Sequence, residues 1–331
     1  MTTNASTGPA TRRYARCRRY ARWLTVLALA AAAWLPAWSA AADQAVGQLA
    51  FQTDQQGTCC RIATVNTDGS GERVLMGMYG FDAAWSPDGA TLAFAGVGKG
   101  GRFDVLSVRL GSQGQTYQLR NLTNSKGHDA SPAWFPEGNR LAFISNRTGA
   151  FNLYTMTASG AEQTDVLPES SNDCGCFSPW QVFAQPAVSP DGTKIAFTSD
   201  RATPGGALNI FLLDLATGVV TALTSDTDPV AVNAEPDFSP DGGRIAWAHG
   251  TITQTGIWVM NADGSAKTPL TSGRANDTQP DYAPDGTRIA FTRGTRPARQ
   301  IWLMSADGNH QHQVTHDGAD DERPDWRPVG P

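Results

Sequence analysis

Short apolar segments alternate with polar turns along most of the chain, a pattern that predicts β-strands rather than helices. The most apolar segment recurs as Leu or Ile, then Ala, then Phe or Trp. Its six copies begin at Leu49, Leu92, Leu141, Ile195, Ile245 and Ile289. A turn of the Ser-Pro-Asp-Gly type precedes five of them, and a sixth proline ends the series. These prolines are Pro87, Pro136, Pro190, Pro240, Pro284 and Pro328, spaced by 44 to 54 residues. Such a period indicates one structural unit repeated along the chain.

Each repeat contains four short strands. In one copy they are expected at Pro236–Phe238, Ile245–Trp247, Ile257–Met260 and a fourth strand that ends in Leu270-Thr271. Four antiparallel strands per repeat, at this spacing, are typical of a propeller blade.

The two ends of the chain complete the count. Residues 49–51, 62–65 and 73–75 resemble the second, third and fourth strands of a repeat that lacks its first strand, while Pro324–Trp326 is a first strand with nothing after it. Joining them would close a ring and leave no exposed sheet edge. We therefore predict an all-β fold, a six-bladed β-propeller with four antiparallel strands per blade, closed by one C-terminal and three N-terminal strands.

The two faces of this ring should differ. The Pro-Asp-Gly turns and the turns between third and fourth strands, such as Asp263-Gly264, fall on one face, called here the short-turn face. Loops from second to third strands and from one blade to the next fall on the other, called here the long-loop face. Because binding residues concentrate in irregular loops on rigid scaffolds, we expect function on the long-loop face.

The N-terminus predicts export. Six arginines between residues 12 and 22 precede an uncharged apolar run, and Ala40-Ala41-Ala42 offers a cleavage site. The apolar run is short for a membrane span, so we expect a signal peptide at 1–42 and one propeller domain at 43–331. Cleavage would change the net charge from −5 to −11. This acidity disfavours nucleic acid or an anionic membrane surface as a partner.

Segments such as Ser189–Arg201 and Ile257–Ser265 resemble the repeats of TolB-type propellers, and the resemblance covers residues 47–331. It implies a periplasmic or secreted propeller; TolB itself is a partner of the lipoprotein Pal and of the Tol complex. TolB carries a further α/β domain before its propeller, which we do not expect here, so its TolA contacts are not carried over. No Gly-x-Ser-x-Gly motif of a fused hydrolase is present.

Acidic residues precede the first strands and should ring the mouth of a central channel. Asp129, Asp277 and Asp321 each lie three residues before a proline in the first strand, called here the repeat proline, and Asn233 takes that place in blade four. These repeat prolines are Pro132, Pro280, Pro324 and, in blade four, Pro236. The candidate binding residues at this mouth are His128, Asp129, Asn233, Asp277, Asp320, Asp321 and Glu322. They could hold a Ca²⁺ or Mg²⁺ ion or a cationic group of a partner. The alternative is that each aspartate caps its own loop.

The longest loop, residues 168–185, interrupts the repeat. Its aromatic residues Phe177, Trp180 and Phe183 fit no strand position and are candidates for a contact surface. The same loop holds Cys174 and Cys176, and another loop on the same face holds Cys59 and Cys60. An even number of cysteines in an exported protein predicts disulfides, with a thiolate metal site as the alternative.

Together these features predict a non-catalytic, monomeric envelope protein that binds another protein or a peptide on its long-loop face. The alternative is a propeller enzyme, a sugar lyase or hydrolase, with a metal at the channel mouth. No catalytic residue and no certain cofactor is assigned from the sequence.

Overall fold

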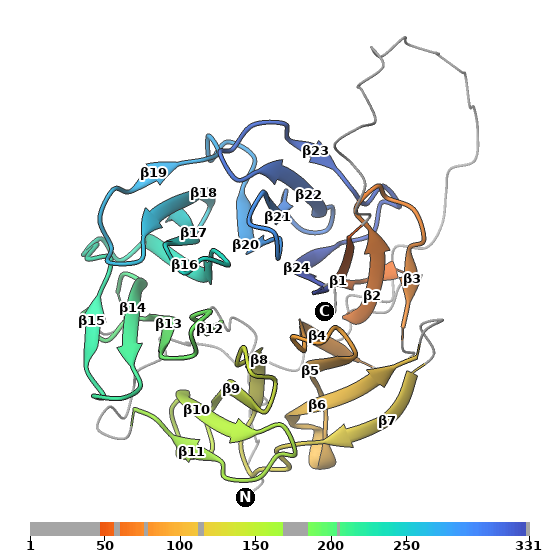
Figure 1. Cartoon of the computed structure of the whole chain (residues 1–331). Coiled ribbons are helices and arrows are strands. Elements are labelled where there is room, and N and C mark those ends of the chain that lie inside the picture. Colours follow the sequence, from red (N-terminus) through yellow and green to blue (C-terminus); the bar gives the residue numbers. More distant parts are fainter. Residues whose placement is uncertain are drawn as a thin grey trace, which may run out of the picture. The chain divides into compact units, whose positions relative to one another are not determined.

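The computed structural model describes residues 47–55, 60–75, 79–111, 116–167, 185–203 and 206–328. Within these ranges the strands form six antiparallel sheets of four strands each, arranged in a ring (Figure 1). The six-bladed propeller expected from the repeat is confirmed. No helix in the described part of the chain has the length and apolar character needed to cross a membrane. The signal peptide predicted at residues 1–42 lies outside the described ranges.

The blades follow one another along the chain. Blade 1 consists of β4 (Gly80–Trp85), β5 (Thr91–Val97), β6 (Phe103–Leu110) and β7 (Thr116–Asn121). Blade 2 consists of β8 (Asp129–Trp134), β9 (Arg140–Ser145), β10 (Asn152–Thr157) and β11 (Thr164–Asp165). Blade 3 consists of β12 (Ala187–Val188), β13 (Lys194–Ser199), β14 (Asn209–Asp214) and β15 (Val220–Ala222). Blade 4 consists of β16 (Ala231–Phe238), β17 (Arg244–Thr251), β18 (Gln254–Asn261) and β19 (Thr268–Pro269). Blade 5 consists of β20 (Asp277–Tyr282), β21 (Arg288–Arg293), β22 (Gln300–Ser305) and β23 (His312–Gln313). In each, the first strand lies nearest the centre of the ring (Figure 1).

Blade 6 joins the two ends of the chain, as predicted. Its strand order is β24 (Glu322–Trp326), β1 (Gln48–Thr53), β2 (Arg61–Asn66) and β3 (Arg73–Val74). The C-terminal strand pairs antiparallel with β1, with Leu49 opposite Trp326 and Ala50 opposite Asp325. The ring is therefore closed by main-chain hydrogen bonds between segments that are far apart in sequence.

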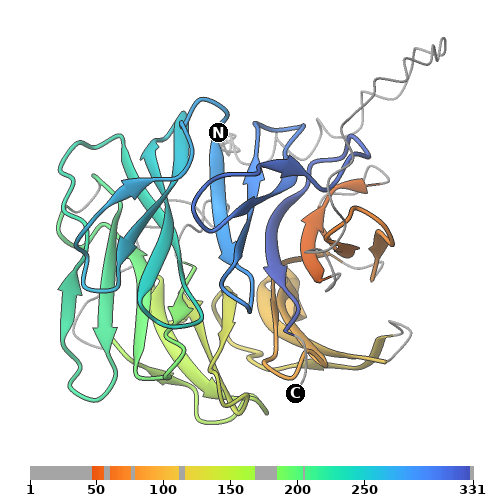
Figure 2. The same ribbon diagram turned by 45° about the horizontal axis from the view of Figure 1, so that its top comes forward.

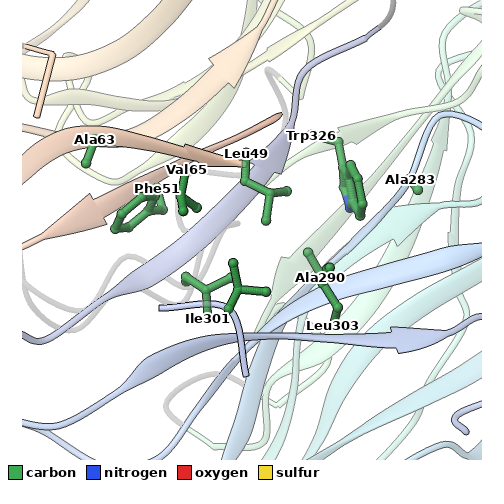
Figure 3. Close-up of a cluster of buried hydrophobic side chains, with 10 residues drawn as sticks. Leu49, Phe51, Ala63, Val65, Ala283, Ala290, Ile301, Leu303 and Trp326 are labelled. Atoms are coloured by element: carbon green, nitrogen blue, oxygen red, sulfur yellow. The ribbon is translucent and has the colours of Figure 1, made fainter. Parts of the chain in front are cut away.

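Apolar side chains hold neighbouring blades together. Between blades 5 and 6, Leu49 and Phe51 of β1 pack with Ile301 and Leu303 of β22 and with Trp326 of β24 (Figure 3). All five are 5% exposed or less. Figure 2 shows the strands of blade 4 running from one face of the ring to the other, so that each blade presents a broad side to its neighbour. Burial of this kind contributes about 25 cal/mol per Å² of apolar surface.

The fourth strands end earlier than predicted. Strands β15 and β19 stop before Leu223-Thr224 and Leu270-Thr271, which the sequence analysis placed at the strand ends. The threonine hydroxyl is the reason, because Oγ1 of Thr224 accepts the main-chain N–H of Ile210 at 2.9 Å. Thr271 does the same for Ile257 at 2.9 Å. A side chain thus replaces the main-chain partner at the end of the ladder.

The repeated turn also has a chemical basis. In blade 3, Oδ1 of Asp191 accepts hydrogen bonds from the hydroxyl of Ser189 at 2.6 Å and from the N–H of Thr193 at 3.0 Å. Gly192 follows with a φ of 68°, a conformation that favours glycine. The order Ser-Pro-Asp-Gly therefore supplies donor, bend, acceptor and left-handed residue in turn.

Candidate functional site

Two of the predicted mouth aspartates lie in buried ion pairs. Asp129 and Asp277 begin β8 and β20 and are 0% and 1% exposed. Oδ1 of Asp129 accepts a hydrogen bond from Nη2 of Arg147 at 3.0 Å. Asp277 accepts two from Arg293, at 2.6 and 2.9 Å. Each carboxylate is therefore neutralised by an arginine of its own blade, which leaves little free charge for an external cation.

Asn233 occupies the same place in blade 4 and joins a different cluster. Its amide nitrogen donates to Oδ2 of Asp226 at 2.7 Å, and its oxygen accepts from Nε1 of Trp247 at 3.1 Å. The same oxygen lies 2.8 Å from Nδ1 of His249. Burial lowers the pKa of His249, although the charge of Asp226 opposes this effect. A hydrogen-bond network centred on an amide thus replaces the ion pair of blades 2 and 5.

In blade 6 the acidic residues pair with two arginines. The carboxylate of Asp320 accepts two hydrogen bonds from Arg299, at 2.9 and 2.7 Å. Glu322 also pairs with Arg299 and accepts from Arg296 at 2.6 Å and from Gln52 at 2.8 Å. Burial alone would raise the pKa of Asp320, but the hydrogen bonds and charge of Arg299 hold it below its ordinary value.

Asp321 has a different environment from the other mouth aspartates. It is 0% exposed, and its burial raises its pKa to about 7, against the effect of the neighbouring Thr53 and Thr315 hydroxyls. Arginine partners like those of Asp129 and Asp277 are not among its recorded interactions within the described residues. Its carboxyl group therefore retains a proton at a higher pH than a solvated aspartate would.

His128 and the long loop complete the predicted set. Nδ1 of His128 accepts the N–H of Phe103 at 3.2 Å, so this histidine connects the start of β6 in blade 1 to the residue before β8 of blade 2. Cys60 is buried, with its sulfur 3.4 Å from the amide nitrogen of Gln52. The other predicted residues, Cys59, Cys174, Cys176, Phe177, Trp180 and Phe183, lie outside the described residues, so the disulfides and the aromatic contact surface stay predictions.

The structure reveals a belt of polar residues that the sequence analysis missed. The residue before the repeat proline, or before its counterpart Ala83, has left-handed φ in five blades; these residues are Asp82, Ser131, Glu235, Gln279 and Arg323, with φ between 49° and 61°. Ser131 donates to Asp82 at 2.7 Å, and Arg323 pairs with the other oxygen of Asp82. On the other side, the N–H of Arg323 donates to Gln279 at 3.0 Å. The belt therefore crosses from blade to blade around the innermost strands.

Arg323 forms a buried charge cluster with acidic residues of this belt and of its own strand. Burial raises the pKa of Glu235, and the nearby charge of Arg323 partly offsets that effect. Burial alone would lower the pKa of Arg323, but the charges of Asp82, Glu322 and Glu235 more than reverse this and raise it. Arg323 is thus a guanidinium surrounded by three carboxylates, and it comes from the strand that closes the ring.

Three further carboxyl groups lie one residue beyond the repeat proline. Asp237, Asp281 and Asp325 occupy this place in blades 4, 5 and 6, and each is partly exposed. Their Oδ2 atoms accept the main-chain N–H groups of Tyr282, Trp326 and Trp85 in the next blade, each at 2.7 Å. The dipeptide Pro-Asp in three of the first strands was the sequence signal for them.

Although each residue is partly exposed, the surrounding protein reduces the solvation of the three carboxyl groups. Burial raises the pKa of Asp237 to about 7 and that of Asp325 to about 8. The pKa of Asp281 rises well above its ordinary value, because of burial first and the charges of Asp325 and Asp237 second. The arrangement can hold protons near neutral pH and would gain from a cationic group placed close to it.

Comparison with known proteins agrees with the architecture. The family model of the TolB beta propeller domain matches residues 25–180 and 175–331. Curated relatives include an uncharacterised protein of Agrobacterium fabrum, 26% identical over 134 residues, and a TolB homolog of Chlorobaculum tepidum, 29% identical over 145 residues. These alignments cover 40% and 41% of this chain and only 41% and 27% of the relatives, so the chain spans less than half of either relative.

Solved structures share the fold over most of the chain. TolB from Acinetobacter baumannii has a TM-score of 0.67 and 21% identity, covering 85% of this chain and 66% of that chain. A putative TolB from Agrobacterium tumefaciens has a TM-score of 0.65 and 20% identity, covering 86% of this chain and 95% of that chain. The family model matches both halves of the chain, and the six blades supply the architecture that it describes. The chain therefore belongs to the TolB β-propeller family.

Proposed function

We propose that this protein is exported to the bacterial periplasm and there binds another protein, or a peptide, through its long-loop face without catalysing a reaction. The observation that carries the proposal is an exposed isoleucine at the tip of a long hairpin in blade 4. Strands β17 and β18 have eight residues each, whereas the matching strands of blade 5 have six. The hairpin tip is therefore longer, and its residue Ile252 is 74% exposed.

The apolar surface at this tip includes a second residue. The N–H of Ile252 donates to the carbonyl oxygen of Val230 at 3.1 Å, and Val230 is 42% exposed. Val97, the last residue of β5 in blade 1, is 47% exposed and belongs to the same face. Neighbouring exposed apolar residues on a soluble scaffold are typical of protein interaction sites.

The charges at the mouth favour an apolar mode of recognition. Asp129, Asp277, Asp320 and Glu322 are occupied by arginines of this chain, so a cationic partner would have to displace an internal ion pair. Such displacement is costly for buried pairs. The partner we propose therefore contacts Ile252 and Val230, together with Phe177, Trp180 and Phe183 of the long loop.

The location rests on sequence and family together. The six N-terminal arginines and the apolar run that follows are those of an export signal, and relatives of the chain include TolB homologs. After cleavage at residue 42 the protein would carry a net charge of −11. That charge favours solubility and agrees with a protein partner rather than a nucleic acid.

Crosslinking in intact envelopes tests the proposal. The double variant Val230→Ser, Ile252→Ser should lose capture of the partner by about tenfold or more at unchanged melting temperature, since central apolar contacts typically contribute about 2 kcal/mol each. Val219→Ser is the matched control, because Val219 is 57% exposed but follows a third-to-fourth-strand turn on the short-turn face. Equal capture by all three proteins would overturn the proposed surface.

A further inference from the structure

A cleft of about 560 Å³ lies between blades 1 and 2 on the short-turn face, opposite the proposed partner surface. Its lining includes Thr91, Arg109 and Arg120 of blade 1, and Trp134 and Glu137 of blade 2. The cleft is therefore distinct from the polar belt and from the long loops. Its volume is in the range of sites for small organic ligands.

The cleft exists because blade 1 departs from the repeat. The residue before the second-strand Leu or Ile is basic in four copies, at Arg140, Lys194, Arg244 and Arg288. Between blades 5 and 6 this residue covers an aromatic ring, since the guanidinium of Arg288 lies 5.0 Å from the ring centre of Trp326. Blade 1 has the short Thr91 at this position.

Blade 6 also lacks the basic residue, but another arginine replaces it. Gln48 stands at the repeat position there, and Arg327 lies 4.8 Å from the ring centre of Trp85 while donating to Gln48 at 3.0 Å. The seam between blades 1 and 2 has Trp134 at the matching position. Among the described residues, no arginine is recorded over the ring of Trp134.

Trp134 is accordingly more accessible than its counterparts. Trp85 and Trp326 are 4% and 5% exposed, whereas Trp134 is only partly buried. Its Nε1 donates to the carbonyl oxygen of Ala84 at 3.1 Å, which fixes the orientation of the indole. The cleft thus offers a rigid aromatic surface without the cation that covers the matching surface between blades 5 and 6 and between blades 6 and 1.

Two arginines supply positive charge beside this surface. Arg120 on β7 is the register partner of Ser107 on β6, and Arg109 lies two residues further along β6, on the same side of the sheet. The other blades carry short turn-capping residues where blade 1 has Arg109; these are Asn66, Thr157, Asp214, Asn261 and Ser305. Both arginines are exposed and take part in none of the ion pairs recorded within the described ranges.

The acidic residues of the cleft are already engaged. Glu137 accepts hydrogen bonds from Arg140 at 2.9 and 2.8 Å. Asp88 accepts from the Ser86 hydroxyl at 2.5 Å and from the N–H of Ala90 at 3.0 Å. Together with the charge of Arg109, these bonds lower the pKa of Asp88. The positive charge of Arg109 is therefore partly balanced by Asp88, and Arg120 carries the least compensated charge in the cleft.

We propose that this cleft binds a small organic anion in which a ring carries a carboxylate. The carboxylate would bind to Arg120 and Arg109, whose planar donors match its geometry, and the ring would lie against Trp134. The proposal is independent of the partner surface on the long-loop face. A sugar acid and an aromatic acid share this chemistry, so the test must separate them.

Ligand-observed NMR titration provides the test, with two acids and their uncharged counterparts. The probes are glucuronate against glucose, for a sugar acid, and benzoate against benzyl alcohol, for an aromatic acid. We expect one acid to bind about fivefold or more tightly than its neutral counterpart, as for a partly exposed charge pair. The acid that shows this difference identifies the ring. Absence of such a difference for both acids, up to about 10 mM, would overturn the proposal.

Variants then locate the binding. Arg120→Gln should remove the difference between acid and neutral probe, and Thr91→Arg should abolish binding without lowering the melting temperature, because a basic residue occupies this position in four other copies. The double variant Thr91→Arg, Arg288→Thr uncovers Trp326 instead, at a seam with Ser305 and His312 in place of the two arginines. It should bind neither acid. Acid binding retained by Thr91→Arg would place the site elsewhere and contradict the proposal.

Discussion

Blades 1 to 3 and blades 4 to 6 share one backbone plan but differ in the residue after the repeat proline or its counterpart. Blades 1, 2 and 3 have Ala84, Ala133 and Ala187 there, whereas blades 4, 5 and 6 have Asp237, Asp281 and Asp325. The first strands of both halves carry a register shift at this point, as in β4 and β16. The repeat therefore determines the β-bulge at this register shift. The charge of the residue at the bulge, on the innermost strand of each blade, can vary without changing the fold.

The acidic half is also where the ring closes. Asp281 accepts a hydrogen bond from β24, and Asp325 of β24 accepts one from β4, so carboxyl groups connect blades 5, 6 and 1 in succession. Arg323 adds its pair with Asp82 across the same seam. The seam between blades 1 and 2 has instead a main-chain contact, from Trp134 to Ala84, and shares the carboxylate of Asp82 through Ser131. The comparison predicts that charge changes affect the closing half most.

The largest effect is expected from Arg323→Met. Removing this guanidinium leaves Asp82 and Glu235 buried without their cation, which typically costs about 3–5 kcal/mol in the free energy of unfolding. Urea denaturation at neutral pH measures the loss. Adding Asp82→Asn should recover part of it, because one uncompensated charge is then removed. A loss below about 1 kcal/mol would contradict a role for Arg323 in closure.

A smaller effect concerns pH. Because the folded-state pKa values of Asp237 and Asp325, about 7 and 8, exceed the ordinary value of 3.8, the folded state holds protons that the unfolded state has lost. The free energy of unfolding should therefore fall as pH rises from about 4 to 8. Each carboxyl group protonated only in the folded state contributes at most about 1.4 kcal/mol per pH unit, and partial exposure reduces this.

The triple variant Asp237→Asn, Asp281→Asn, Asp325→Asn isolates this contribution. Asparagine keeps an acceptor oxygen for the N–H of the next blade but cannot ionise. Denaturation across the pH range should show a flatter profile than that of the unmodified protein. A residual slope of the same sign is expected from Glu235 and Asp321, whose pKa values are also raised. An unchanged slope would show that the three aspartates are solvated.

The sequence predicted the blades because the information lies in recurrent residues. Apolar residues after each Pro-Asp-Gly turn form the second strands, and their near-complete burial follows from their composition. The left-handed residues before the repeat proline escaped prediction for the opposite reason. Asp82, Ser131 and Arg323 are all polar but differ in charge and size, so no single residue type marks them. Their conformation follows from the bulge and from contacts with neighbouring blades.

The candidate sites could be predicted only in part. Asp129 and Asp277 were identified at the starts of first strands, but their partners lie just after or at the end of the second strands, at Arg147 and Arg293. Only the register of the hairpin brings them together. The cleft at Trp134 arises from the small size of Thr91. This residue is recognised as unusual only when the six copies are aligned and the basic residue of four of them is seen to be missing from blade 1.

The smallest effect is expected at the turns, where the two halves should behave alike. Asp191 in blade 3 and Asp241 in blade 4 both accept a serine hydroxyl, at 2.6 and 2.5 Å, and a main-chain N–H, at 3.0 and 2.9 Å. These hydrogen bonds lower the pKa of Asp191 to about 2 and also lower that of Asp241. Both carboxylates are exposed, so solvent reduces what the shift contributes to stability.

Substitution of either aspartate by alanine should therefore cost only about 0.5 kcal/mol, as for the loss of an exposed local cap. The pH dependence has the opposite sign to that of the axial carboxyl groups. A lowered folded-state pKa means that the stabilisation is complete above about pH 4 and is lost as pH falls towards 2. Urea denaturation of Asp191→Ala and Asp241→Ala at pH 7 should give losses equal within about 0.3 kcal/mol. Unequal losses would mean that the charge difference between the two halves, which lies on the innermost strands, also changes the stability of the turns.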